Sequence, residues 1–256
     1  MSRVEHSDLI SRQFGPRAQD YVASSVHAQG EDLAELADLA RSLESPRALD
    51  IGCGGGHATY AVAAHAGAVT AYDMSPEMLA AVKEEASRRG LKNVQTERGP
   101  AEQLPFAEAS FDLVVTRFSA HHWRDVPRAL AEAGRVLKPS GRIVVIDVVA
   151  AENPLLDTFL QTVEMLRDPS HVRDYSVSEW TSMLERAGFA PGAPKRRRLT
   201  IGFDAWIARM RTPPVYVEAI RKLQADMPDE VSRYFGIAPD GSFFLDAATM
   251  PATVRA

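Results

Sequence analysis

Ala48-Leu49-Asp50-Ile51-Gly52-Cys53-Gly54-Gly55-Gly56-His57 is the stretch of this chain that decides the fold. A short apolar run leads through an acidic residue into a glycine-rich turn, and a helix-like segment at residues 58–66 follows directly. The order strand, glycine turn, helix places the turn at the carboxyl edge of a parallel sheet, where open α/β folds bind their ligands. Glycines let the backbone come close to a ligand, and the N-terminus of the next helix offers free N–H groups to a carboxylate or phosphate.

The spacing of the glycines distinguishes between three kinds of nucleotide site. The dinucleotide fingerprint, counted from Gly52, needs Gly or Ala at position 57, where this chain has His57. A P-loop needs Gly-Lys-Ser/Thr, which does not occur in the sequence. The pattern Asp50-x-Gly52-x-Gly54-x-Gly56 instead resembles motif I of the class I S-adenosylmethionine-dependent methyltransferases. The resemblance implies that Asp50, Gly52, Gly54 and Gly56 bind S-adenosylmethionine and its product S-adenosylhomocysteine.

A second apolar run, residues 69–73, also ends at a carboxylate. Asp73 lies roughly 20 residues after the first glycine, where an acidic residue commonly holds a ribose diol. A carboxylate suits that task because its two oxygens accept from both hydroxyls. Ser75 is a candidate N-cap of the helix that follows. We expect Met74 and Met78 to pack on the adenine ring, with ordinary core packing as the alternative for Met78.

A third strand is predicted at residues 93–98, and the loop after it carries a further motif. Residues 99–106 resemble the Gly-Asp-Ala-Glu-x-Leu-Pro-Phe motif of methyltransferases related to those of ubiquinone and menaquinone biosynthesis. In that family the loop contacts the adenine edge through a backbone N–H and an acidic side chain. Pro100 replaces the usual Asp and has no N–H to offer. The resemblance therefore assigns adenine recognition to Ala101 and Glu102.

A fourth strand at residues 110–117 leads into the segment that should face the methyl acceptor. Within residues 118–123, His121 and His122 are the candidates for a general base, because the ordinary pKa of histidine lies near the working range of an enzyme. The alternative is that one histidine packs under the loop and the other orders it through a backbone hydrogen bond. Arg117 is a candidate partner for a carboxylate of the donor or acceptor, or else for an acid at the surface.

The segment that follows completes the first half of the fold. A helix is predicted from residue 125 to residue 137, a turn at residues 138–141, and a fully apolar fifth strand at residues 142–149. The Arg-Val-Leu-Lys-Pro-x-Gly-Arg pattern of residues 135–142 is again typical of the family. Residues 166–173 and 206–213 are similar to one bacterial subgroup of small-molecule-type methyltransferases, so the motifs specify the cofactor better than the acceptor.

The resemblance implies a Rossmann-like class I methyltransferase fold of the α/β class. We expect a mostly parallel seven-stranded sheet flanked by helices, with N-terminal helices and a helical insertion after the fifth strand. The chain is long enough for one such domain. Its expected parts are an N-terminal helical cap (1–45), the cofactor-binding half (46–149), the helical insertion (150–190), and C-terminal strands with a helical segment (191–256).

Three further side chains are candidates for contacts around the site. In related enzymes an N-terminal segment folds over the bound donor, and Tyr21 is our candidate for that contact, with a helix merely docked on the sheet as the alternative. His171 and Tyr175 belong to the expected insertion. They are candidates either for the acceptor pocket or for structural residues of the cap.

The composition narrows the class of protein. The chain has 256 residues, of which 45% are hydrophobic, and a single cysteine. One cysteine excludes a disulfide framework and a cysteine-rich zinc site, and we expect no metal ligand. Because Cys53 lies inside the glycine loop, it is a poor candidate for a nucleophile. The sequence shows no signal peptide and no apolar span of roughly 18 residues, so we expect a cytoplasmic protein without membrane contact.

The charge balance bears on the partners. A net charge of −5 argues against a nucleic-acid partner, since phosphate binding usually requires a basic face. Lys195-Arg196-Arg197-Arg198 is the one dense basic run. We interpret it as a solvated strand or turn protected against edge pairing, with an anion-binding patch as the alternative.

These features predict a methyltransferase that acts on a small or lipid-like molecule, with O- or C-methylation expected. The donor carries its own leaving group, so the protein mainly aligns the reactants and excludes water. One alternative is methylation of a nucleic acid or protein. DNA amino-methylating enzymes carry Asp/Asn-Pro-Pro-Tyr/Phe after the fourth strand, which this chain lacks. The other alternative is a non-catalytic module that binds an adenosyl ligand. The acceptor and the oligomeric state stay open.

Overall fold

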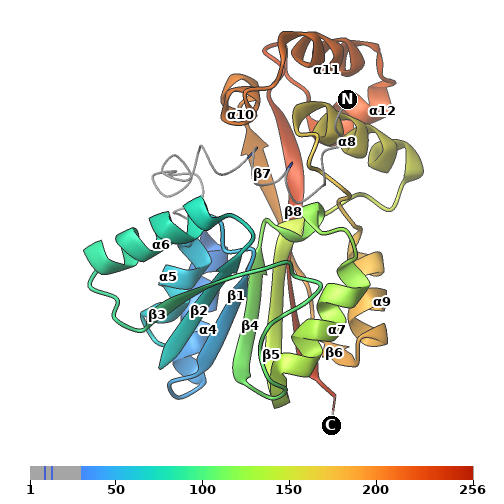
Figure 1. Ribbon diagram of the computed structural model, residues 1–256. Coiled ribbons are helices and arrows are strands. Elements are labelled where there is room, and N and C mark those ends of the chain that lie inside the picture. Colours follow the sequence, from blue (N-terminus) through green and yellow to red (C-terminus); the bar gives the residue numbers. More distant parts are fainter. Residues whose placement is uncertain (1–8, 10–12, 14–29, 256) are drawn as a thin grey trace, which may run out of the picture.

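A mostly parallel sheet forms the centre of the molecule (Figure 1). The computed structural model describes residues 9, 13 and 30–255. Within them the strand order is β3-β2-β1-β4-β5-β8-β6, and β7 pairs with β8 beside this path. The strands are β1 (Arg47–Ile51), β2 (Ala68–Asp73), β3 (Val94–Arg98), β4 (Phe111–Arg117), β5 (Leu137–Val148), β6 (Phe189–Pro191), β7 (Lys195–Ile201) and β8 (Phe243–Val254).

Strands β1 to β5 pair in parallel, which confirms the expected sheet type. Strand β8 runs antiparallel to β5, β6 and β7. The described residues form eight strands where seven were expected, because the basic run Lys195–Ile201 pairs with the first half of β8. The fifth strand also begins earlier than predicted, since Leu137 pairs with Phe111 across a register shift and the expected turn lies within β5.

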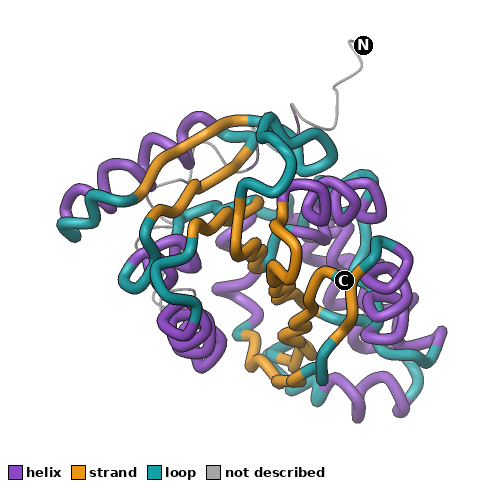
Figure 2. Tube along the Cα trace, turned by 90° about the horizontal axis from the view of Figure 1, so that it is seen from below, coloured by secondary structure: helices purple, strands orange, loops and turns teal. Residues whose placement is uncertain are grey.

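Helices cover both sides of the sheet (Figure 2). They are α4 (Glu31–Ser42), α5 (His57–Ala63), α6 (Pro76–Arg88), α7 (Val126–Val136), α8 (Pro154–Arg167), α9 (Val177–Arg186), α10 (Phe203–Met210), α11 (Pro214–Asp226), α12 (Asp229–Phe235) and the 3₁₀ turn η2 (Ala120–His122). The predicted helix start at Ser75 is confirmed: its hydroxyl accepts the N–H of Met78 at 3.2 Å, with proline as the next residue.

Alternation along the central strands divides the core into two layers. Leu113 and Val115 of β4 pack with α4 and α5, whereas Val114 packs on the opposite side with α7 and α9. Successive side chains of a strand point to opposite faces, so a continuously apolar strand buries both of its faces. Strand β1 is buried in the same way, from Ala48 to Ile51. Because β1 and β4 pair in parallel, their carboxyl ends lie at the same edge of the sheet.

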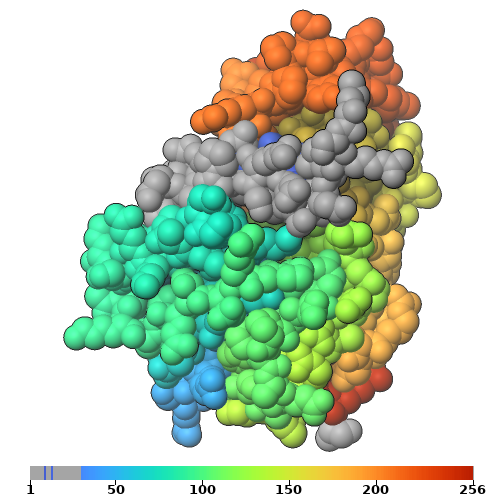
Figure 3. All heavy atoms as spheres, viewed as in Figure 1, coloured from blue at the N-terminus to red at the C-terminus, as the bar shows by residue number. Residues whose placement is uncertain are grey.

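A helical cap lies beyond the carboxyl ends of the parallel strands (Figure 1). Helices α8, α10, α11 and α12 share a separate hydrophobic core with the ends of β7 and β8, built on residues such as Phe159, Trp206 and Phe243. Figure 3 shows the part of this cap that follows β7 in orange, above the blue and green half that carries the sheet. Of the segment expected as an insertion, α8 joins the cap, whereas α9 packs on α7 and β6.

None of the helices in the described residues is both long and apolar enough to span a bilayer.

Candidate active site

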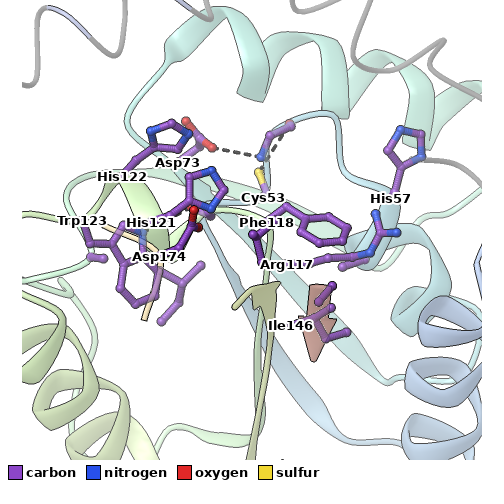
Figure 4. A pocket seen from close by; sticks show the side chains of 18 of the residues that line it. Cys53, His57, Asp73, Arg117, Phe118, His121, His122, Trp123, Ile146 and Asp174 are labelled. Atoms are coloured by element: carbon purple, nitrogen blue, oxygen red, sulfur yellow. Dashed lines mark hydrogen bonds between the residues drawn. The ribbon is translucent and has the colours of Figure 1, made fainter. Parts of the chain in front are cut away.

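A cavity of about 1120 Å³ lies between the carboxyl edge of the sheet and the cap. One end is formed by the glycine loop, the end of β2 and the loop after β3. The other end is formed by η2, by α8 and α10 of the cap, and by the outer parts of β7 and β8. The sheet thus presents its turn residues, and the cap its side chains, to one cavity. Figure 4 shows this cavity from the side of the glycine loop and the histidines.

The glycine loop turns through left-handed backbone conformations, with φ of 68° at Gly52, 48° at Gly54 and 81° at Gly56. A Cβ at Gly54 would meet no atom within 4 Å, so this glycine borders open space in the cavity. A Cβ at Gly56 would lie 2.7 Å from the Tyr60 ring. Gly56 does not line the cavity, and its close approach to Tyr60 packs the loop against α5.

Asp50 is fully buried at the end of β1 and borders the cavity. Its Oδ2 accepts the hydroxyl of Thr59 at 2.6 Å, while Oδ1 accepts no hydrogen bond from any described residue. Burial raises the pKa of this carboxyl to about 6. A buried carboxylate oxygen without a partner carries a desolvation cost that a donor group of a ligand would relieve.

Asp73, at the end of β2, holds the glycine loop in place. Its Oδ2 accepts the N–H of Gly54 at 2.9 Å, and its Oδ1 accepts the N–H of Ser75 at 2.9 Å. Burial raises the pKa of this carboxyl above its ordinary value. Met74 and Met78 both line the cavity, and Met78 is only 2% exposed. Met78 is therefore both a buried residue and a wall of the cavity.

The loop after β3 is held by a tyrosine. The hydroxyl of Tyr72 lies 3.1 Å from the carbonyl oxygen of Pro100 and 3.2 Å from that of Gln103. Between them Ala101 and Glu102 line the cavity. The carboxylate of Glu102 also accepts backbone N–H groups at the start of α7, at 2.9 and 3.3 Å, so it ties this loop to the segment after η2.

Arg117 lies at the end of β4 and pairs with Asp32 of α4 at 2.5 Å. Each side chain is only 7% exposed. The arginine thus meets an acid, as one of its two interpretations held, but the acid is buried instead of lying at the surface. Arg117 also borders the cavity and stacks on Phe118 with its guanidinium carbon 4.7 Å from the ring centre.

His121 and His122 project from η2 into the cavity with ring centres 4.2 Å apart (Figure 4). Nδ1 of His121 lies 2.6 Å from Oδ1 of Asp147, and the His121 N–H donates to Oδ2 of the same carboxylate at 3.3 Å. Burial lowers the pKa of His121, but the adjacent Asp147 charge outweighs it and raises the pKa to about 9. Nδ1 of His122 lies 3.2 Å from the carbonyl oxygen of Ser170. Burial and the charge of His121 lower the pKa of His122 to about 3.

Two buried carboxylates near these histidines were not predicted from the sequence. Asp147 lies on β5 and Asp174 in the loop before α9, with exposures of 1% and 2%. Asp147 gave no signal because it lies in an apolar strand, and Asp174 because it lies in a segment without a motif. Burial raises the pKa of Asp174 well above its ordinary value.

The remaining candidates lie outside the cavity or outside the described residues. His171 is buried with Nε2 3.0 Å from the amide oxygen of Gln161, and Tyr175 packs edge-on against Trp180. Neither lines the cavity, which favours their structural interpretation. Tyr21 lies outside the described residues.

The basic run on β7 is paired with acids of the same chain. Lys195 and Arg197 contact Glu35 of α4 at 3.2 and 2.6 Å, and Arg198 contacts Asp246 of β8 at 3.2 Å. These contacts favour the interpretation of the run as a charged strand.

A protein family, several related sequences and a solved structure match this chain. A methyltransferase domain family matches residues 49–145. The uncharacterized protein YafE of Escherichia coli is 45% identical over 77% of this chain and 95% of its own length. The uncharacterized methyltransferase YcgJ of Bacillus subtilis is 39% identical over 78% of this chain and 79% of its own length. The YcgJ crystal structure superimposes with a TM-score of 0.84, covering 88% of this chain and 99% of that one. The ubiquinone/menaquinone biosynthesis C-methyltransferase UbiE of Brucella anthropi is 34% identical, over 54% of each chain.

Proposed function

This chain belongs to the class I S-adenosylmethionine-dependent methyltransferases of the UbiE-like type, and from that premise we propose that it methylates a small or lipid-like molecule held between the glycine loop and the helical cap. The observation that carries the proposal is a single cavity with two chemically different ends. One end consists of backbone turns and the buried acids Asp50 and Asp73. The other end consists of two histidines and the mixed apolar and charged side chains of the cap.

The residues at the first end fit S-adenosylmethionine. The partnerless Oδ1 of Asp50 matches a ligand that brings a donor such as the ammonium of the methionine part. The open space above Gly54 leaves room for a ligand against the backbone. We assign Asp73, Met74 and Met78 to the ribose and adenine, together with Gly52, Ala101 and Glu102, all of which line the cavity.

The size of the cavity supports a second ligand. Pockets for small molecules commonly measure about 300–1,000 Å³. A cavity of about 1120 Å³ therefore has room for a donor and a small acceptor at once. At the acceptor end Leu199, Ile201 and Leu245 supply apolar surface beside Trp206. These side chains suit a flat or lipid-like molecule better than a nucleic-acid strand, whose phosphates need free cations.

The chemistry asks little covalent work of the protein. When bound, the donor supplies a methyl group on a sulfonium centre that is its own leaving group. The cap and the sheet edge align the acceptor and exclude water from the cavity. A proton acceptor is needed only where the methylated atom carries a proton. Of the two histidines at that end, His122 is the one that burial keeps neutral. The relatives named for menaquinone and ubiquinone biosynthesis support a quinone-type acceptor, and one of them is named as a C-methyltransferase.

Titration calorimetry with S-adenosylmethionine, S-adenosylhomocysteine and NADH tests the first half of the proposal. We expect both adenosyl compounds to bind at roughly micromolar concentrations, or about −8 kcal/mol at 1 μM, and NADH not to bind. Binding of NADH alone would overturn the assignment.

Incubation with methyl-labelled donor tests the second half. We expect label in low-molecular-weight hydroxylated aromatics, for which menadiol is a suitable probe, and none in Asp50→Ala protein. Label found only in added protein or nucleic acid would exclude a small acceptor.

A further inference from the structure

Three side chains from separate parts of the chain meet at the acceptor end of the cavity. His121 belongs to η2, Asp147 to the end of β5, and Asp174 to the loop that precedes α9. One nitrogen of the histidine and one oxygen of each carboxylate all lie within 4.8 Å of one another. Figure 4 shows Asp174 beside the His121 ring at the cavity wall. Long-range packing thus assembles a compact set of one imidazole and two carboxylates.

One oxygen of the Asp174 carboxylate, Oδ2, has no hydrogen-bond partner among the described residues. The residue is 2% exposed. The nearest candidate is Nε2 of His171, 3.9 Å away, which lies 3.0 Å from the amide oxygen of Gln161 instead. A buried carboxylate in this state costs free energy until a cation or donor reaches it.

An arginine and an acid that line the same cavity as Asp174 have hydrogen-bond partners of their own. Arg167 borders the cavity, but its guanidinium contacts Glu164 at 3.2 Å and the carbonyl oxygen of Trp206 at 3.1 Å. Asp168, a further buried carboxylate, accepts the N–H and the hydroxyl of Ser170 at 2.9 and 2.7 Å. Arg197 and Arg198, which line the same end, pair with Glu35 and Asp246. Among the described residues no hydrogen-bond donor reaches Oδ2 of Asp174, which favours a cation as the missing partner.

We propose that His121, Asp147 and Asp174 bind a divalent transition-metal ion such as Mn²⁺ or Zn²⁺ on the cavity wall. A mixed set of imidazole and carboxylate ligands suits such ions, whereas Ca²⁺ and Mg²⁺ prefer sites made of oxygen alone. Three protein ligands leave coordination positions open, as in catalytic metal sites. The side chain of His121 is 18% exposed, so the open side of the ion faces the cavity.

A metal ion at this site would narrow the acceptor class to molecules that carry a hydroxyl group. This inference about the acceptor rests on the proposed function. A hydroxyl group bound to the ion loses its proton more readily, because the ion stabilises the oxygen's negative charge. The O–H bond breaks, the proton passes to solvent through the open side of the cavity, and the electron pair stays on the oxygen that faces the donor end. His121 then serves as a ligand, and His122 remains the imidazole available to contact the acceptor.

Metal binding is measured on the full chain after treatment with a chelator, by calorimetric titration with Mn²⁺ and with Zn²⁺ at neutral pH. We expect one ion per chain. Asp174→Asn should weaken binding by at least roughly tenfold. The matched control is Asp157→Asn, which removes the same charge from α8, where Asp157 pairs with Arg173 at 3.0 Å. We expect that control to bind metal like the parent.

Several outcomes are decisive. Equal Mn²⁺ affinity in Asp174→Asn and the parent, or no stoichiometric binding by the parent, overturns the site. If Asp174→Asn does not fold, Co²⁺ added to the parent still decides, because ligation by an imidazole nitrogen gives visible absorption bands that His121→Gln should change. S-adenosylhomocysteine affinity is measured on the same samples. A parent protein that does not bind S-adenosylhomocysteine would count against the proposed function. A parent protein that binds S-adenosylhomocysteine but no metal ion would count only against the metal site.

Discussion

Gly54→Ala separates the conformational role of the glycine loop from its role in binding. Gly54 has a φ of 48°, and a Cβ there would meet no atom within 4 Å. In the free protein the substitution therefore causes no clash and costs only the left-handed conformation, roughly 1–2 kcal/mol. For a chain of this length, that cost lowers the melting temperature by about 2–8 °C.

Donor binding should suffer more than stability. If the donor lies against the loop, the added methyl group occupies space that the ligand needs. Overpacking of this kind costs about 1–3 kcal/mol. At 1.4 kcal/mol for each factor of ten, we expect S-adenosylhomocysteine affinity to fall by about 5-fold to about 140-fold.

The chain offers a matched control in Gly90→Ala. Gly90 has a φ of 72°, a Cβ there would also meet no atom within 4 Å, and the residue does not line the cavity. Calorimetry should show a similar fall in melting temperature for both variants. Titration should show weaker binding of S-adenosylhomocysteine only for Gly54→Ala. Equal S-adenosylhomocysteine affinity in the two variants would refute the argument, because the donor would then lie elsewhere.

Three further substitutions test other contacts. Asp73→Asn removes one of two anionic oxygens that accept backbone N–H groups, so S-adenosylhomocysteine affinity should fall by about 1.5–3 kcal/mol with an unchanged circular dichroism spectrum. An unaltered dissociation constant would contradict the role of Asp73. Burial raises the pKa of Asp50 to about 6; the charge of Asp73 adds to this effect, and Arg117 opposes it. The affinity for S-adenosylhomocysteine should therefore rise from about pH 5 to about pH 7, as the carboxyl ionises. Asp50→Asn should remove this pH dependence. If the affinity of the parent falls between about pH 5 and about pH 7 instead, Asp50 does not pair with the ammonium group of the ligand. Asp32→Asn takes the acid from the buried Arg117, so urea denaturation should show about 3–5 kcal/mol less stability. Asp38→Asn, in an exposed pair on the same helix, should change stability by at most about 1 kcal/mol, and equal losses in both would refute the argument.

The donor end of the cavity was largely predictable from the sequence. Asp50 and Asp73 each end an apolar run, and parallel strands bring such ends to the same edge, where both residues border the cavity. Ser75 begins its helix as its residue type indicates. At Gly56 the glycine spacing indicates a tight backbone, whereas the Tyr60 ring decides which side of that backbone is open.

The acceptor end was only partly predictable. His121 and His122 were found because they follow a strand end, but their partners were not. Asp147 is 26 residues from His121 in sequence, and Asp32 is 85 residues from Arg117. No local pattern relates residues at such distances, and their pairing depends on how the helices and strands pack.

The sequence by itself determined the sheet type and the edge at which Asp50 and Asp73 border one cavity. These properties follow from short-range patterns: apolar runs, turn glycines and helix caps act through neighbouring residues. Only the tertiary structure decided that β7 extends β8 into a cap, that α8 joins α10 to α12, and that Asp174 lies beside His121. The physical reason is that burial and charge are properties of a residue's surroundings, which the chain acquires only when distant segments pack together.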